Sequence, residues 1–314
     1  MNSAASMGET ALTVTAAPAA EVAALEAVGG RTQAFVALTK PRIVLLVVIT
    51  VGVGFLLGAR GSAHPTTLLA TLLGSALVAG GASALNMVWE RDRDALMRRT
   101  RRRPIPSGRV APGEAALFGA VLGAVGTLIL LAFSGATAAA VAATTLALYV
   151  WVYTPLKPVT TLNTAIGAVP GALPPVIGWS AATGTLSMEG WTLFLIVFLW
   201  QFQHFLAIAW VYREDYARGG MKMLPCVDPT GRMSGRQSTL HALALVPVGL
   251  LPTVVGLAGM FYFAGALALG LYYLAASARF WADADDASAR KLMGASFLYL
   301  PAVLLLLLLN PLPA

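Results

Sequence analysis

ALNMVWERDRDALMRRTRRRPIPSGRV, residues 84–110, joins one long apolar run to the next and decides how the remaining chain is interpreted. Asn86, Glu90 and Asp94 recur every four residues, so a helix with 3.6 residues per turn places them on one stripe. An amide and two carboxylates in line are oxygen ligands of the kind that Mg²⁺ prefers. The arginine-rich run 98–103 follows and adds dense positive charge. The two features together predict a site for a metal-bound diphosphate at a membrane surface.

The composition is typical of a polytopic membrane protein. Of the 314 residues, 58% are hydrophobic and only 11% are charged, which is unusual for a soluble domain. The net charge of +7 is explained better by basic cytoplasmic loops than by binding to nucleic acid. The single cysteine, Cys226, excludes a disulfide within the chain.

Nine apolar runs are each long enough to cross a bilayer, which takes about 20 residues. We therefore expect an all-α membrane domain over residues 35–314. The alanine-rich segment 1–34 is predicted to be a disordered cytoplasmic tail. The expected membrane helices cover residues 41–59, 66–89, 113–133, 135–153, 162–182, 190–212, 239–260, 262–281 and 292–310.

The distribution of basic residues supports this number of helices. With nine spans, 20 of the 21 lysines and arginines fall on the side of the N-terminal tail, and only Arg60 falls on the other. The positive-inside rule then predicts a cytoplasmic N-terminus. The tail has no lysine or arginine before Arg31, so it resembles neither a secretory signal nor a transit peptide. These features indicate a bacterial cell (inner) membrane.

Two further polar segments fall on the same side of the membrane. The first, Tyr153-Thr-Pro-Leu-Lys157, closes the fourth span, and the second covers residues 204–225 at the end of the sixth. Because the charges gather at one mouth and the interior is apolar, the pattern suits a substrate with a charged head and an apolar tail.

The pattern Asn86-Met87-x-x-Glu90-x-x-x-Asp94 resembles the first acidic motif of the UbiA superfamily of intramembrane prenyltransferases, in the variant found in its haem-farnesylating branch. Gln203 stands where that branch usually has proline, and the second motif lacks the double-aspartate pattern of other members. The resemblance covers residues 35–310 and includes Lys40-Pro41-Arg42, Asp94 to Gly108, Tyr153 to Lys157, Asn163, Gly171, Pro174, Pro175, Gly178, Trp179, Trp200, His204, Phe205, Asp215, Tyr216 and Met223 to Pro225.

The resemblance implies a UbiA-type helix bundle around a central cavity. The implied reaction transfers a farnesyl group from farnesyl diphosphate to a vinyl group of haem b, adds water and gives haem O. Haem b is then a substrate and not a permanent cofactor, and Mg²⁺ is the cofactor. Membrane lipid is an expected partner, and haem A synthase or terminal oxidase assembly is an expected receiver of the product.

The resemblance also assigns roles to individual residues. The implied metal ligands, which are also catalytic, are Asn86, Glu90, Asp94 and Asp215. The expected cationic cradle for the diphosphate consists of Arg42, Arg99, Arg103 and the catalytic Lys157. The remaining expected substrate-binding residues are Tyr153, Asn163, Trp200, His204 and Tyr216.

His204 precedes Asp215 by eleven residues, close to three full helical turns, so one continuous helix would turn both to the same side. His204 would then lie deeper than the diphosphate, where a neutral imidazole ligates haem iron or orients the porphyrin. The alternative is a histidine that only forms a packing hydrogen bond. Similarly, Arg98, Arg101 and Arg102 are better explained as a topology signal that contacts anionic lipid.

Two other functions are compatible with parts of the pattern. A UbiA-type aromatic prenyltransferase of quinone biosynthesis would share the acidic motif, but Met87, Glu90 and His204 argue against it. A membrane transporter would place charged residues at the middle of the membrane, whereas here they gather at one mouth.

Overall fold

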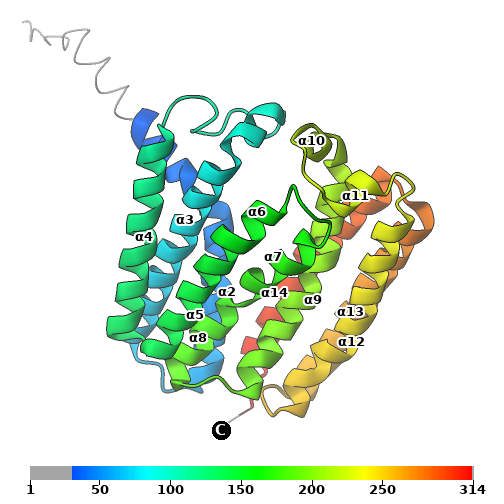
Figure 1. Cartoon of the computed structure of the whole chain (residues 1–314). Coiled ribbons are helices and arrows are strands. Elements are labelled where there is room, and N and C mark those ends of the chain that lie inside the picture. Colours follow the sequence, from blue (N-terminus) through cyan, green and yellow to red (C-terminus); the bar gives the residue numbers. More distant parts are fainter. Residues whose placement is uncertain (1–29, 313–314) are drawn as a thin grey trace, which may run out of the picture.

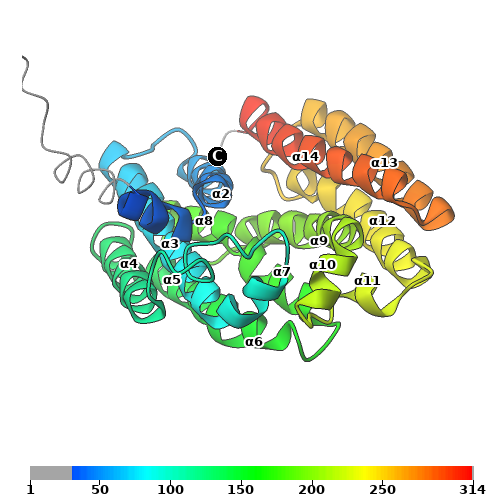
Figure 2. The ribbon, with the colours of Figure 1, turned by 90° about the horizontal axis from the view of Figure 1, so that it is seen from above.

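The computed structural model describes residues 30–312, and every regular element in this range is a helix. Nine helical spans of the described chain are long and apolar enough to cross a membrane, as the sequence predicted. Figure 1 shows them standing side by side, and Figure 2 shows α3, α4 and α5 at one end of the bundle and α12, α13 and α14 at the other. The elements are α2 (Pro41–Ala59), α3 (Pro65–Leu96), α4 (Pro112–Phe133), α5 (Ala136–Ala147), η1 (Leu148–Tyr153), α6 (Thr154–Leu156), α7 (Asn163–Ala172), α8 (Pro174–Thr183), α9 (Met188–Val211), α10 (Arg213–Arg218), α11 (Leu224–Val227), α12 (Arg232–Val254), α13 (Met260–Asp283) and α14 (Asp286–Leu309).

Helix α3 is the element that builds the site. It runs unbroken for 32 residues to Leu96, so the acidic stripe lies on one helix, as predicted, and the helix extends beyond the expected end at residue 89. Glycines let α4 approach it closely, because a Cβ at Gly81 would lie only 2.6 Å from the carbonyl oxygen of Gly119. This packing fixes α3 along most of its length.

Several predicted spans are interrupted near residues that the sequence analysis singled out. The fourth continues from α5 through a π-helical turn, η1, into α6. The fifth is divided at Leu173, because Pro174 and Pro175 follow it and proline has no backbone N–H to donate. The sixth ends at Val211, and Tyr212, with φ −108° and ψ 19°, separates α9 from α10.

The break at Tyr212 corrects one prediction. His204 lies on α9 and Asp215 on α10, so the expectation that one continuous helix turns both to the same side is wrong. Counting eleven residues as three turns holds only inside a single helix.

The N-terminal boundary also needs correction. Residues 1–29 of the predicted tail lie outside the described residues, whereas residues 30–38 form a helix, which we call the pre-membrane helix. Residues 30–34 therefore belong to the folded part. Ala34 and Leu38 are fully buried in a cluster with Ala84 and Met87 of α3, and this apolar contact holds the pre-membrane helix against the bundle.

Candidate active site

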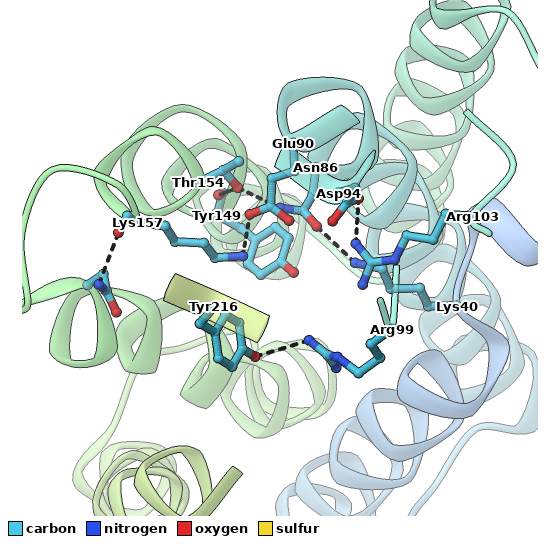
Figure 3. Close-up of polar contacts among 11 residues, drawn as sticks. Lys40, Asn86, Glu90, Asp94, Arg99, Arg103, Tyr149, Thr154, Lys157 and Tyr216 are labelled. Atoms are coloured by element: carbon cyan, nitrogen blue, oxygen red, sulfur yellow. Dashed lines mark hydrogen bonds and ion pairs between the residues drawn. The ribbon is translucent and has the colours of Figure 1, made fainter. Parts of the chain in front are cut away.

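The three stripe residues of α3 each contact a cation from a different part of the chain (Figure 3). Lys40 Nζ donates to Asn86 Oδ1 at 2.8 Å, and Lys157 Nζ lies 2.6 Å from Glu90 Oε1. Arg103 pairs with the third stripe residue, Asp94. The group therefore contains three basic side chains and only two carboxylates. The excess positive charge favours an anion.

Lys40 reaches the stripe from the turn between the pre-membrane helix and α2. Its backbone is left-handed, with φ 51°, an unusual conformation for a residue with a side chain. Burial, together with the nearby Arg103 guanidinium, lowers the pKa of Lys40 to about 7. Its ammonium group is therefore poised to change charge near neutral pH.

Lys157 lies one residue after α6, next to two tyrosine rings. Its Nζ is 4.5 Å from the centre of the Tyr153 ring, which in turn lies 5.4 Å from the Tyr149 ring. Burial opposes the charged form of Lys157, but the Glu90 carboxylate outweighs it and raises the pKa of the lysine above its usual value. The ion pair is largely withdrawn from solvent, since the Lys157 and Glu90 side chains are 14% and 8% exposed.

Asp94 lies at the mouth of the site and keeps one oxygen free. Its Oδ2 accepts from Arg103 NH1 at 2.7 Å, whereas its Oδ1 is buried and has no hydrogen-bond partner in the described part of the chain. Thr100 Oγ1 donates to the Asp94 carbonyl oxygen at 2.9 Å and ties the loop that carries Arg103 back to α3. A buried carboxylate oxygen without a partner is costly unless a ligand completes it.

His204 lies on α9, in contact with α14. Its Nδ1 is 2.8 Å from Ser296 Oγ, and its ring stacks on Trp200 with a centroid distance of 4.9 Å. The Ser296 hydroxyl donates to Met293 O at 2.6 Å, so its oxygen accepts from Nδ1–H. The network thereby assigns the proton to Nδ1 and leaves the lone pair on Nε2.

Asp215 makes its contacts with the loop after α3. Its Oδ1 accepts from the Arg98 backbone N–H at 2.9 Å and also pairs with Arg218, and its Oδ2 accepts from the Arg99 backbone N–H at 3.0 Å. Partial burial opposes ionisation, but these donors outweigh it and lower the pKa of Asp215. The carboxylate is therefore ionised at neutral pH and already paired.

Comparison with known proteins identifies the family. A model of the UbiA prenyltransferase family matches residues 47–312, most of the chain. The chain belongs to the UbiA prenyltransferase family. A protein of Solibacter usitatus named protoheme IX farnesyltransferase is 44% identical over 285 residues, which cover 88% of this chain and 98% of that protein. One of the same name from Salinibacter ruber is 43% identical over 276 residues and covers 88% and 98%.

Solved structures of UbiA proteins share the fold. A structure of digeranylgeranylglyceryl phosphate synthase has a TM-score of 0.74 at 20% identity and covers 89% of this chain and 98% of its own. A UbiA homologue from Archaeoglobus fulgidus bound to GPP and Mg²⁺ has a TM-score of 0.65 at 15% identity, with 87% and 99% covered. These matches confirm the predicted all-α, UbiA-type bundle.

Three oxygen-bearing side chains lie on one face of α3. Asn86, Glu90 and Asp94 align their side-chain oxygens along one helix face, and the buried Asp94 Oδ1 offers an unused oxygen. No group of three or more histidine, cysteine, aspartate or glutamate residues converges within residues 30–312. The set fits an ion such as Mg²⁺ that takes its remaining ligands from substrate phosphates and water.

The structure brings some of the predicted site residues together and separates others. Arg103, Lys157 and Tyr153 lie with the α3 stripe, whereas Arg42 is exposed and lines a groove of about 630 Å³ between the pre-membrane helix and α2. The buried Asn163 donates its amide to the carbonyl oxygens of residues 157, 160 and 222 and so joins two loops.

Arg99 lies over two tyrosine rings at the start of α10. Its guanidinium carbon is 5.1 Å from the ring centre of Tyr212 and 5.4 Å from that of Tyr216, whose hydroxyl accepts from its NH2 at 3.2 Å. Trp200 is buried and donates its Nε1–H to the Ser296 carbonyl at 2.9 Å, which anchors α9 to α14.

Two contacts to the stripe were missed by the sequence analysis, those of Lys40 and Thr154 with Asn86. Lys40 stands beside the predicted Arg42, and only its left-handed backbone shows which of the two points inward. Thr154 accepts from Asn86 Nδ2 at 3.0 Å and donates to the Tyr149 carbonyl at 2.8 Å, five residues back. That five-residue spacing belongs to the π-helical turn, for which the sequence carries no recognised signal.

Proposed function

We propose that this UbiA enzyme transfers a farnesyl group from farnesyl diphosphate to a vinyl group of haem b, with addition of water, and so makes haem O. The observation that carries the proposal is the α3 stripe, in which each of Asn86, Glu90 and Asp94 faces a cation. The substrate class comes from the names of the two relatives, each of which aligns with this chain over 98% of its own length.

The diphosphate end of the substrate would lie between the stripe and its cations. Asn86, Glu90 and Asp94 would hold Mg²⁺, which when bound offsets the negative charge of the leaving diphosphate. Arg103 and Lys157 now pair with the carboxylates, and they would turn toward the phosphate oxygens when the metal neutralises these carboxylates.

The farnesyl end would lie among apolar and aromatic groups. The bond between farnesyl C1 and the diphosphate oxygen breaks, the terminal carbon of the haem vinyl group attacks C1, and water adds to the resulting cation with loss of a proton. Tyr149 and Tyr153 lie next to Lys157, where their ring faces can stabilise positive charge. The surrounding apolar side chains exclude water until the carbon–carbon bond has formed.

Haem b would bind near His204. The hydrogen bond to Ser296 leaves Nε2 as a lone pair without a partner among the described residues, which is the tautomer that ligates iron. The exposed ring of Phe297, whose centre is 5.2 Å from that of His204, supplies flat apolar surface for a porphyrin, and the stacked Trp200 holds the imidazole from the other side.

The proposal includes a location and an orientation. The family and nine apolar helices make this a multi-pass membrane protein. The concentration of basic residues on the side of the acidic motifs supports a bacterial inner membrane with a cytoplasmic N-terminus and active site. The proposed catalytic domain begins with the pre-membrane helix. Haem A synthase or a terminal oxidase assembly complex is the proposed receiver of haem O.

The reaction itself tests the proposal. Purified protein in lipid vesicles is incubated with Mg²⁺, farnesyl diphosphate and haem b, and the extracted haem is analysed by mass spectrometry. We expect a product heavier than haem b by one farnesyl and one hydroxyl group. Asp94→Ala should abolish it, whereas Asp92→Ala, an exposed acid on the same helix, should not. Prenylation of 4-hydroxybenzoate instead of haem would favour the quinone alternative.

A further inference from the structure

Asp215 joins α10 to the loop that follows α3. Its carboxylate accepts hydrogen bonds from two consecutive backbone N–H groups of that loop, those of Arg98 and Arg99. Arg218, one turn along α10, pairs with the same carboxylate. The side chain is 9% exposed, so solvent screens these contacts little.

Neighbouring contacts strengthen the same junction. Arg93 NH1 donates to the carbonyl oxygens of Gly219 and Gly220 at 3.0 and 3.1 Å. Met97 is buried in a small cluster with Met221 and Met223. The segment 97–100 is thereby held from both sides immediately before the loop reaches Arg103.

We propose that Asp215 is a positioning residue that clamps the loop after α3, and that through this clamp it holds Arg103 and Arg99 in place for the diphosphate. Arg103 lies five residues beyond Arg98 and pairs with Asp94, and the Arg103 backbone N–H donates to Thr100 O at 2.8 Å. A shift of the backbone at 98–99 would therefore be transmitted to the guanidinium opposite the stripe.

The occupancy of the carboxylate argues against a direct role in holding metal. Both oxygens already accept charge-assisted hydrogen bonds, and Arg218 balances the charge. A metal ion would have to displace these donors and leave the two backbone N–H groups without their carboxylate partner. Asp94, in contrast, has an oxygen with no partner.

Hydrogen exchange tests the clamp without substrate or metal. The full-length protein in lipid nanodiscs with EDTA is compared as wild type, Asp215→Asn and Glu214→Gln, an adjacent exposed acid that serves as the matched control. An asparagine can accept from only one of the two N–H groups and turns its own NH₂ group toward the other. We expect amides 98 and 99 to exchange about tenfold faster or more in Asp215→Asn, and to be unchanged in Glu214→Gln.

Kinetics then tests whether the clamp positions Arg103 and Arg99 for the diphosphate. This test rests on the proposed farnesyl transfer, whereas the exchange experiment is independent of it. We expect Asp215→Asn to raise KM for farnesyl diphosphate about tenfold without changing the Mg²⁺ concentration for half-maximal activity at saturating substrate. The double variant with Arg103→Lys should be no worse than the poorer single variant, because both act through one contact.

Two results would overturn the proposal. Unchanged exchange at amides 98 and 99 in Asp215→Asn would show that the carboxylate does not hold the loop. A Mg²⁺ requirement raised more than about threefold in Asp215→Asn but not in Glu214→Gln, with effects additive to Arg103→Lys, would make Asp215 a metal ligand.

Discussion

Removing the charge of Lys157 should lower both the stability of the fold and the activity, and the two losses can be measured separately. Lys157 Nζ lies 2.6 Å from Glu90 Oε1, and the two side chains are 14% and 8% exposed. Lys157→Met keeps an apolar stem of similar length but leaves the Glu90 carboxylate buried without a counter-charge. Breaking a buried pair in this way costs about 3–5 kcal/mol. Glu90→Gln alone should cost a similar amount, because it leaves the ammonium group unpaired.

The double variant Lys157→Met/Glu90→Gln separates stability from activity. Because neither charge is left alone, we expect it to recover to within about 1–2 kcal/mol of wild type. Its activity should stay lost, since Glu90 is a proposed metal ligand and Lys157 a proposed diphosphate contact. Thermal unfolding in detergent, together with the haem product assay, measures both. If each single variant costs less than about 1 kcal/mol, or if the two losses add, then the pair is not energetically coupled and the reasoning is wrong.

Three further predictions follow from other contacts. The pKa of Lys40 near 7 means that its charge is lost as pH rises, so KM for farnesyl diphosphate should increase from about pH 6 to about pH 8, and the permanently charged Lys40→Arg should flatten that profile. A methyl group at Gly167 would overlap the Tyr153 ring, so Gly167→Ala should cost about 1–3 kcal/mol of stability and lower kcat. Adding Tyr153→Leu should partly restore the stability but not kcat. His204→Ala should weaken haem b binding about tenfold or more, measured by absorption, and leave farnesyl diphosphate affinity unchanged; equal loss of both ligands would assign the histidine to packing.

The fold was predictable because the bilayer leaves few choices for an apolar chain. Nine runs of apolar residues must be helices, since lipid offers no partner for backbone N–H and C=O groups. The stripe on α3 was predictable for a related reason: residues 84–96 contain no glycine or proline, so the helix continues past the apolar segment to Leu96.

The parts of the site that were missed depend on backbone irregularities and tertiary packing. Lys40 enters the site through a left-handed turn, and η1 shifts the register that sets Thr154 against Asn86. Residue spacing assumes a regular helix, so it also failed at Tyr212, where α9 ends. The two backbone N–H groups that Asp215 binds lie more than 110 residues away in sequence, and no local pattern reports such contacts.

The resemblance to other UbiA enzymes and the structure differ most at Asp215. The motif alone places this aspartate among metal ligands, because family comparison matches residue types by position. Its neighbours in the structure are two backbone N–H groups and Arg218, and on these contacts we propose a positioning role for it.

The most direct test of the central claim is a structure of this protein with Mg²⁺ and farnesyl thiodiphosphate, an analogue that ionises slowly. We predict metal density beside Asn86, Glu90 and Asp94, with Lys157 and Arg103 turned from the carboxylates to the diphosphate oxygens and Asp215 still bound to the Arg98 and Arg99 backbone. Metal and diphosphate bound away from the α3 stripe, with the Glu90–Lys157 and Asp94–Arg103 pairs intact, would contradict the account.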